Sequence, residues 1–307
     1  HLFAPIGLDI GAKTPSEIAV SVVSELMAIY NKTSKKSLRD KSENLIIVRG
    51  AGDLASATIL RLHNAGYRVL SLEIEKPTTI RRTVSYSTAM VRGEMSIEGV
   101  MCKRVESVEE AKSVMDNSMI AILHDPAGVS IKKLHPAVVV DAIIAKKNLG
   151  TTIDMAPLVI ALGPGFIAKK DCHIVVETMR GHYLGTIIRQ GSAIANTGEP
   201  GEIGGESVRR VLHSPYAGLF MSDKHIGDIV TIGEVIATVG EKEITATLSG
   251  VIRGLLANNI EIPVGFKIGD IDPRGDVKSC STVSDKGRAI AGAVLEAVDA
   301  FHSGRAL

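Results

Sequence analysis

Residues 45–73 read LIIVRGAGDLASATILRLHNAGYRVLSLE, and this stretch decides the fold. Residues 45–48 have the apolar composition of a short buried strand. A Gly-rich turn leads from them into a helix that we expect to end at Gly66. Residues 67–73 predict a second strand. A strand, a Gly-rich turn, a helix and a strand in this order predict the first βαβ unit of a Rossmann-type fold.

The turn carries the pattern Gly50-x-Gly52-x-x-Ala55. Gly50 permits the tight turn, Gly52 lets a pyrophosphate approach the backbone, and Ala55 lets helix and strand pack closely. The amino end of the following helix supplies N–H groups and a positive dipole for a phosphate. We therefore predict a nucleotide-binding loop; the alternative is a turn that serves packing only.

Acidic residues near this loop bear on the ligand. Glu73 ends the second strand, where a carboxylate holds a ribose hydroxyl, and Glu75 is its substitute if the register slips. Asp53 lies in the loop itself, facing the expected phosphate, although it can also cap the helix. A carboxylate there is unusual for plain pyrophosphate binding. The nucleotide's identity therefore stays open between NAD(P), a metal-bridged phosphate and a pterin-type nucleotide.

The rest of the chain predicts a large α/β region followed by a small all-β module. Strands alternate with helices up to about residue 205, which predicts a mostly parallel sheet. Residues 214–271 show short strands, Gly turns and a faint repeat, typical of a β sandwich with pseudo-twofold symmetry. The expected divisions are an N-terminal helical segment (1–30), a polar linker (31–44), the Rossmann-like domain (45–205), the β module (206–275) and a C-terminal helix (276–307).

Ends of parallel strands gather at one edge of such a sheet and form the usual ligand crevice. Several Gly-rich or basic segments follow predicted strands, so we expect a shared anion-binding cleft there. Its expected lining comprises Arg81, Arg82, Lys146, Lys147, Asn148, Gly163, Gly165, Asn196 and Gly198.

Histidines and acidic residues are densest around residues 171–182. On a strand, His173 and Glu177 share one face, which makes available a metal site, an acid/base pair or a structural hydrogen bond. We favour a structural or substrate-positioning role. His173 and His182 are the acid/base candidates if the protein is an oxidoreductase. No metal site is predicted.

Composition restricts the partners. The 307 residues include 35 basic and 34 acidic side chains, only 3% are aromatic and Trp is absent, so no nucleic-acid partner is expected. No run approaches the roughly 18–20 apolar residues of a membrane span. Three dispersed cysteines without a CxxC pair are typical of a reduced, cytoplasmic protein. Because His1 lies in sequence that reads as structured, we expect a truncated N-terminus. Homo-oligomer formation stays open.

Several long motifs resemble one family. They lie at 49–55, 73–82, 140–148, 155–166, 176–182, 196–205 and 272–286. Together they resemble the YqeB-type accessory proteins of the selenium-dependent molybdenum hydroxylase system, over about residues 43–300. Residues 4–30 resemble the extreme C-terminus of the XdhC type, accessory factors that handle molybdenum cofactor for xanthine-dehydrogenase-like enzymes.

The resemblance implies a role in maturing a molybdenum hydroxylase, by cofactor insertion or by selenium or sulfur loading. The implied ligand is a nucleotide or the molybdenum cofactor, and the implied partners are hydroxylase subunits and an XdhC-like factor. The XdhC-like part lacks strands and a phosphate loop, so it should not bind cofactor by itself. The rival functions are an NAD(P)-dependent oxidoreductase and a docking scaffold for hydroxylase subunits; whether the protein is an enzyme stays open.

Two further residues carry expectations. The β module resembles biotinyl/lipoyl-type barrel-sandwich hybrids, but its hairpin around Lys242 is short and lacks the flanking carrier motif, so we expect no biotin or lipoyl group there. Cys280 lies in polar sequence near Lys278 and Lys286, whose charges would stabilise a thiolate. A thiolate is what a chalcogen carrier needs, which makes Cys280 the candidate residue for chalcogen transfer.

Overall fold

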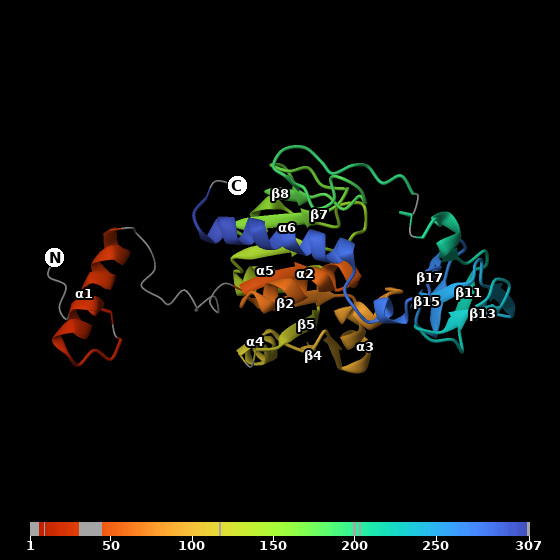
Figure 1. Cartoon of the computed structure of the whole chain (residues 1–307), viewed down its shortest axis with the longest axis horizontal. Helices are drawn as coiled ribbons and strands as arrows, with labels where there is room; N and C mark the ends of the chain where they lie inside the picture. The colour runs from red at the N-terminus through yellow and green to blue at the C-terminus, as the bar shows by residue number, and fades with distance from the viewer. Residues whose placement is uncertain are drawn as a thin grey trace. The chain divides into compact units, whose positions relative to one another are not determined.

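The computed structural model describes residues 6–8, 10–30, 45–116, 118–198, 201–202 and 204–305 (Figure 1). The chain divides into two compact units, residues 1–43 and 44–307. The predicted linker at 31–44 lies outside the described residues.

The first unit is built around one helix, α1 (Pro15–Tyr30). Side chains fix its start: the Thr14 hydroxyl accepts from the Glu17 N–H (3.3 Å) and the Glu17 carboxylate accepts from the Thr14 N–H (2.9 Å). This reciprocal pair is a capping box. The helix buries Ser21 and Glu25, while most of its apolar side chains are exposed.

A nine-stranded sheet forms the centre of the second unit, in the order β3-β4-β5-β2-β1-β6-β7-β8-β9. Strands β4 to β8 of this order are parallel, and β3 and β9 pair antiparallel at the two edges. The predicted mostly parallel sheet is therefore confirmed. Its strands are β1 (Leu45–Arg49), β2 (Arg68–Glu73), β3 (Glu94–Ile97), β4 (Val100–Val105), β5 (Ile120–His124), β6 (Val138–Asp141), β7 (Leu158–Leu162), β8 (Ile174–Val176) and β9 (Ile187–Ile188).

The predicted βαβ unit is present as β1, α2 (Asp53–Asn64) and β2. Strands β1 and β2 pair in parallel, with Leu45 opposite Arg68. Gly66 follows the helix with φ +90°, and its N–H donates to the His63 carbonyl (2.9 Å). A left-handed residue just after the last turn ends the helix as the sequence predicts.

Helices cover both faces of the sheet. One face packs against α2 and the last helix, α6 (Asp285–His302), around a core that includes Ile59 and Val294. A Cβ at Gly287 would lie 2.9 Å from the Ala57 Cβ, so α2 and α6 touch closely there. The other face packs against α4 (Val108–Asp116) and α5 (Val129–Leu134). The shorter helices are η2 (Arg82–Val84), η3 (Tyr86–Thr88), α3 (Ala89–Arg92), η4 (Ile153–Met155), η5 (Val208–Arg210) and η6 (Val277–Cys280).

The predicted β module is observed as two four-stranded antiparallel sheets around one core that contains Phe220 and Ile252. It packs on the segment before η2, where the Leu255 N–H donates to the Ile80 carbonyl (2.8 Å). One sheet contains β10 (Val211–His213), β17 (Lys267–Asp272), β15 (Gly250–Leu255) and β12 (Ile229–Val230). The other contains β14 (Lys242–Thr245), β13 (Val235–Val239), β11 (Gly218–Met221) and β16 (Ile260–Ile262).

Lys242 begins β14 directly after the two-residue turn that joins it to β13. Because this turn is tight and lacks the carrier motif, we expect Lys242 to carry neither biotin nor a lipoyl group. Intact-protein mass spectrometry of material from the native host tests this. A population heavier by either group would show that the hairpin is a carrier site.

Among the described residues, no helix combines the length and the apolar composition that a bilayer span requires.

Candidate functional site at the carboxyl edge of the sheet

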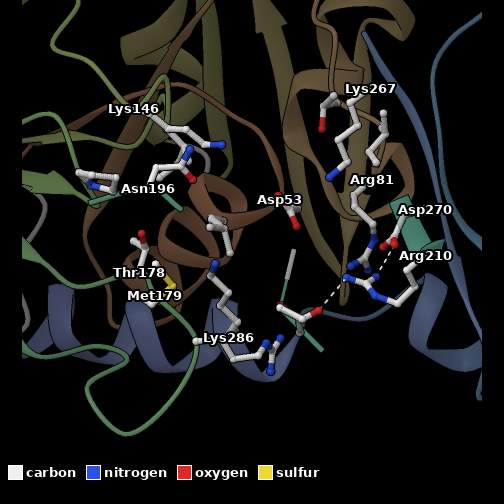
Figure 2. Close-up of a pocket in the computed structure, with 18 of the residues that line it drawn as sticks. Asp53, Arg81, Lys146, Thr178, Met179, Asn196, Arg210, Lys267, Asp270 and Lys286 are labelled. Carbon is white, nitrogen blue, oxygen red and sulfur yellow. Dashed lines mark hydrogen bonds and ion pairs between the residues drawn. The ribbon is translucent and has the colours of Figure 1, made fainter. Parts of the chain in front are cut away.

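A cavity of about 410 Å³ lies at the carboxyl ends of the parallel strands, between the sheet and the β module (Figure 2). Strand β2 follows β1 in the chain and pairs with it on one side. The later strands β6, β7 and β8 lie in that order on the other side of β1, so the strand order reverses there. Ligands of open α/β sheets bind at such a point of reversal. The predicted meeting of strand ends is therefore observed. The described lining residues include Asp53, Leu54, Thr79, Arg81, Ile144, Lys146, Pro164, Thr178, Met179, Arg180, Ile194, Asn196, Arg210, Arg253, Lys267, Asp270 and Lys286.

The Gly-rich turn places the amino end of α2 against this cavity. Gly50 has φ +94°, and a Cβ there would lie 3.0 Å from the Ala142 oxygen. Gly52 caps the helix without any side-chain hydrogen bond. In the described part of the chain, nothing accepts a hydrogen bond from the N–H groups of Gly52, Asp53 or Leu54. These are the donors that an α-helix leaves unused at its start, and they suit an anion.

Glu73 stabilises the turn from the side away from the cavity. Its carboxylate accepts from the Ala51 N–H (2.8 Å) and from the Ile74 N–H (2.8 Å), and it does not line the cavity. Burial raises the pKa of Glu73. The expected ribose contact is corrected accordingly: the acidic residue at the end of β2 fixes the loop instead.

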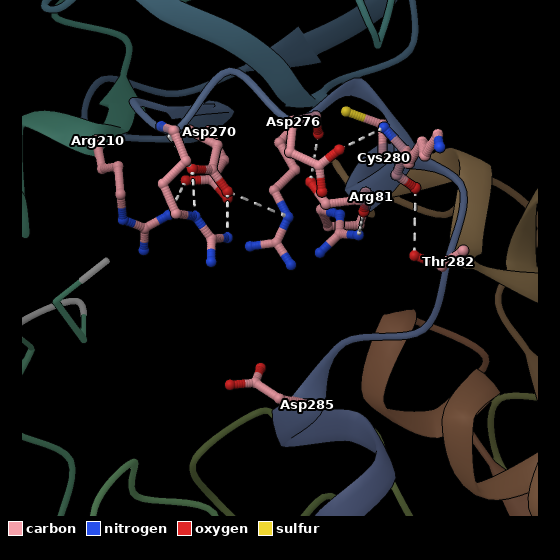
Figure 3. Close-up of polar contacts among 12 residues, drawn as sticks. Arg81, Arg210, Asp270, Asp276, Cys280, Thr282 and Asp285 are labelled. Carbon is pink, nitrogen blue, oxygen red and sulfur yellow. Dashed lines mark hydrogen bonds and ion pairs between the residues drawn. The ribbon is translucent and has the colours of Figure 1, made fainter. Parts of the chain in front are cut away.

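Three buried arginines form a basic wall opposite the loop. The side chains of Arg81, Arg210 and Arg253 are 6–7% exposed. The Nε atom of each is buried, and no described residue accepts a hydrogen bond from it. Arg210 is paired with Asp270, Arg81 donates through Nη2 to the Ser279 carbonyl (3.2 Å), and the Arg253 Nε lies 3.9 Å from Asp272 (Figure 3). Of the three, Arg81 has no described carboxylate within 4.0 Å, so its charge is open to an anion in the cavity.

Two lysines face the same space. Lys267 begins β17 and Lys286 lies in the first turn of α6. No described carboxylate lies within 4.0 Å of either ammonium group. Water reaches Lys267 inside the cavity, yet the surrounding protein lowers the pKa of both lysines by disfavouring the charged form. Asp53 lies between these two lysines in the cavity (Figure 2), and its charge opposes this effect at both sites.

The remaining wall consists of the loops after β6, β7, β8 and β9. The apolar side chains Ile144, Met179 and Ile194 and the polar Asn196 lie there with the cations Lys146 and Arg180. Buried Glu177 positions two of these loops by accepting from the Met179 N–H (2.6 Å) and the Ile194 N–H (2.7 Å).

Four residues of the predicted site line the cavity: Asp53, Arg81, Lys146 and Asn196. Others form its frame. A Cβ at Gly165 would lie 2.7 Å from the Lys147 backbone, and one at Gly163 would lie 2.6 Å from the Thr178 hydroxyl. Asn148 accepts from the Thr151 N–H (2.8 Å) and so stabilises a turn. The predicted residues outside the lining are Gly50, Gly52, Ala55, Glu73, Arg82, Lys147, Asn148, Gly163, Gly165 and Gly198.

Sequence reasoning missed most of the basic wall: Arg210, Arg253 and Lys267 went unnoticed. Arg253 lies among the apolar residues of β15, and Lys267 is the first residue of β17, which also contains two aspartates. A charged side chain inside an apolar strand was the available indication.

The structure does not bring His173 together with Glu177, and it gives His173 a structural hydrogen bond, the role that the sequence analysis favoured. His173 immediately precedes β8, so it lies at the amino edge of the sheet, where its Nδ1 accepts from the Val159 N–H (3.0 Å). Four residues of strand separate it from Glu177, about 13 Å, which is too far for direct pairing. His182 is exposed, packs edge-on against Tyr183 and does not line the cavity. Neither histidine can therefore act on a ligand in the cavity.

The expected thiolate at Cys280 is also wrong. Its side chain is 4% exposed and its thiol faces the Ile252 carbonyl (3.7 Å). Burial raises the pKa of this thiol, and the lowering effects of Arg81 and Arg253 do not compensate. Polar neighbours in sequence did not keep the side chain at the surface.

Comparisons with known proteins support the family resemblance. A family model described as the XdhC Rossmann domain matches residues 1–26. The uncharacterized protein YqeB of Escherichia coli (strain K12) is 50% identical over 302 residues, which are 97% of this chain and 56% of that protein. The chain thus spans a little over half the length of that relative, and its similarity to it covers nearly every residue.

Among solved structures, the chain is similar to the product-bound ectoine utilization protein EutE (DoeB) from Ruegeria pomeroyi, at 11% identity and a TM-score of 0.24. It is also similar to a succinylglutamatedesuccinylase/aspartoacylase from Rhodobacter sphaeroides, at 12% identity and a TM-score of 0.24. Each match covers 75% of this chain and 85% of the other.

Proposed function

We propose that this protein is a cytoplasmic accessory factor for a selenium-dependent, xanthine-dehydrogenase-like molybdenum hydroxylase, and that its cleft binds a nucleotide or the molybdenum cofactor through phosphate. The observation that carries the binding proposal is the conjunction of the unpartnered N–H groups of α2 with the cavity-lining cations Arg81, Lys267 and Lys286, none of which has a described carboxylate within 4.0 Å. The similarity to YqeB and to the XdhC domain supports the accessory role. Its partners would be hydroxylase subunits and an XdhC-like factor.

The residues present fit such a ligand. A phosphate at the start of α2 would accept from the free N–H groups and gain from the helix dipole and from Lys286. The uncharged remainder would lie against Met179 and Ile194, with the Asn196 amide available to hydrogen-bond a ring edge. The protein's part in this proposal is binding and orientation.

Mass spectrometry of small molecules released from protein purified from its own host tests the proposal directly. We expect a phosphate-bearing molecule in near-stoichiometric amount, released on denaturation. Calorimetric titration of the emptied protein with the identified molecule should then restore binding. Release of no phosphate-bearing molecule, together with no heat from any nucleotide tested, would refute the binding proposal.

Anion binding should be coupled to proton uptake. In the free protein, the surrounding protein atoms disfavour the charged forms and lower the pKa values of Lys267 and Lys286, and a bound anion favours the charged forms and raises these values. Affinity should therefore fall as the pH rises from 7 towards the ordinary lysine range, earlier than for an exposed lysine. Calorimetry in two buffers of different ionisation enthalpy measures the uptake. Net proton release on binding would contradict this assignment.

A further inference from the structure

We infer that the β module supplies a second anion subsite, so that the cleft takes a ligand with two anionic groups, such as a diphosphate. One group would sit at the start of α2 and the other at the arginine wall. This inference rests on the proposed function, because it specifies the ligand class of the same cleft.

The two subsites lie on different walls. In Figure 2, Arg81, Arg210 and Lys267 lie on one side of the cavity and Lys286 lies below Asp53. Arg210, Arg253 and Lys267 belong to the β module or its lead-in helix, whereas the N–H groups of α2 belong to the Rossmann-like part. A single phosphate at the start of α2 would leave Arg81 and Lys267, which line the opposite wall and have no described carboxylate within 4.0 Å, without an anionic partner.

The charge balance of the cavity also calls for more than one anionic group. Arg210 is neutralised by Asp270, Arg180 by Asp285, and Arg253 shares Asp272 with Arg274. The lining cations left without a described carboxylate within 4.0 Å are Arg81, Lys146, Lys267 and Lys286. Asp53 offsets one of these four charges. Asp272 faces two arginines and can offset only one of them, so the excess is at least three. It exceeds the charge of about −2 that a phosphate monoester carries.

Asp53 separates the two subsites. In Figure 2, Asp53 lies between Lys267 and Arg81 on one side and Lys286 on the other, and all four line the cavity. An anionic group placed midway between the walls would meet this carboxylate. Two groups, one on either side of Asp53, avoid it and reach both sets of donors.

Calorimetric titration of the full chain with inorganic phosphate and with inorganic pyrophosphate, at one pH and ionic strength, tests the inference. We expect pyrophosphate to bind at least about tenfold more tightly than phosphate, since it adds charge-assisted hydrogen bonds at the second subsite. Lys267→Met should remove most of that preference, while Lys286→Met should weaken both anions. Lys242→Met removes an equivalent charge from the same module away from the cleft and is the matched control.

The outcomes separate the two proposals. Equal affinity for phosphate and pyrophosphate in the wild type, or an unchanged preference in folded Lys267→Met protein, would overturn the second subsite and leave the first. If neither anion nor any nucleotide binds, the proposed function itself fails. Circular dichroism of each variant establishes that it is folded.

Discussion

Gly52→Val should reduce the affinity for the phosphate-bearing ligand by about 100-fold or more. A Cβ at residue 52 would meet no protein atom nearer than the Thr79 hydroxyl at 4.0 Å, and Thr79 lines the cleft. The added side chain would therefore project in front of the free N–H groups of α2. Losing two charge-assisted hydrogen bonds costs about 3 kcal/mol, which corresponds to about 100-fold in the dissociation constant.

The fold should tolerate this substitution. Gly52 has φ −64°, which any residue adopts, and a valine at the cap costs the helix only about 1 kcal/mol. Calorimetry gives the affinity and thermal unfolding gives the stability. Gly52→Ala is the graded control, with an intermediate loss of binding. Wild-type affinity in a folded Gly52→Val protein would mean that the turn serves packing only.

Gly50→Val should instead destabilise the protein by about 3 kcal/mol or more and lower the midpoint of thermal unfolding by roughly 10 °C. Gly50 has φ +94°, which strains a β-branched residue, and the new Cβ would lie 3.0 Å from both the Ala142 oxygen and the Ile143 Cα. These are backbone atoms at the end of β6, next to β1 in the sheet, and they cannot move without disturbing the strand pair.

Differential scanning calorimetry or urea unfolding measures this loss. Gly99→Val is the matched control, because Gly99 also has positive φ, at +84°, but nothing lies within 4 Å of its Cβ position. It should show the strain alone. A Gly50→Val protein as stable as Gly99→Val would mean that the approach of β1 and β6 is looser than the structure shows.

Gly50 and Gly52 have different roles in the turn. Gly50 allows β1 and the end of β6 to approach, and Gly52 leaves space in front of the helix. The β module then closes the other side of that space with its arginines and Lys267. The module is therefore a wall of the cleft as well as a separate β structure.

The sequence by itself determined the elements whose cause is local. The apolar run of β1 and the turn from Gly50 to Ala55 depend on neighbouring residues, and both occur as predicted. The capping box of α1 has the same local cause. The short strands and glycine turns of residues 214–271 predicted an all-β module, which is observed as two antiparallel sheets.

Only the tertiary structure decided which side chains meet in the cleft. Arg210, Arg253 and Lys267 reach it because the β module packs on the segment at Ile80, more than a hundred residues earlier in the chain. His173 does not reach the cleft because it precedes β8, and the length of this strand separates it from the carboxyl edge where the cleft lies. Cys280 is buried because η6 packs beside β15, a contact that its polar neighbours do not reveal. A strand's pattern tells which residues share a face, and the packing of distant segments determines what that face contacts.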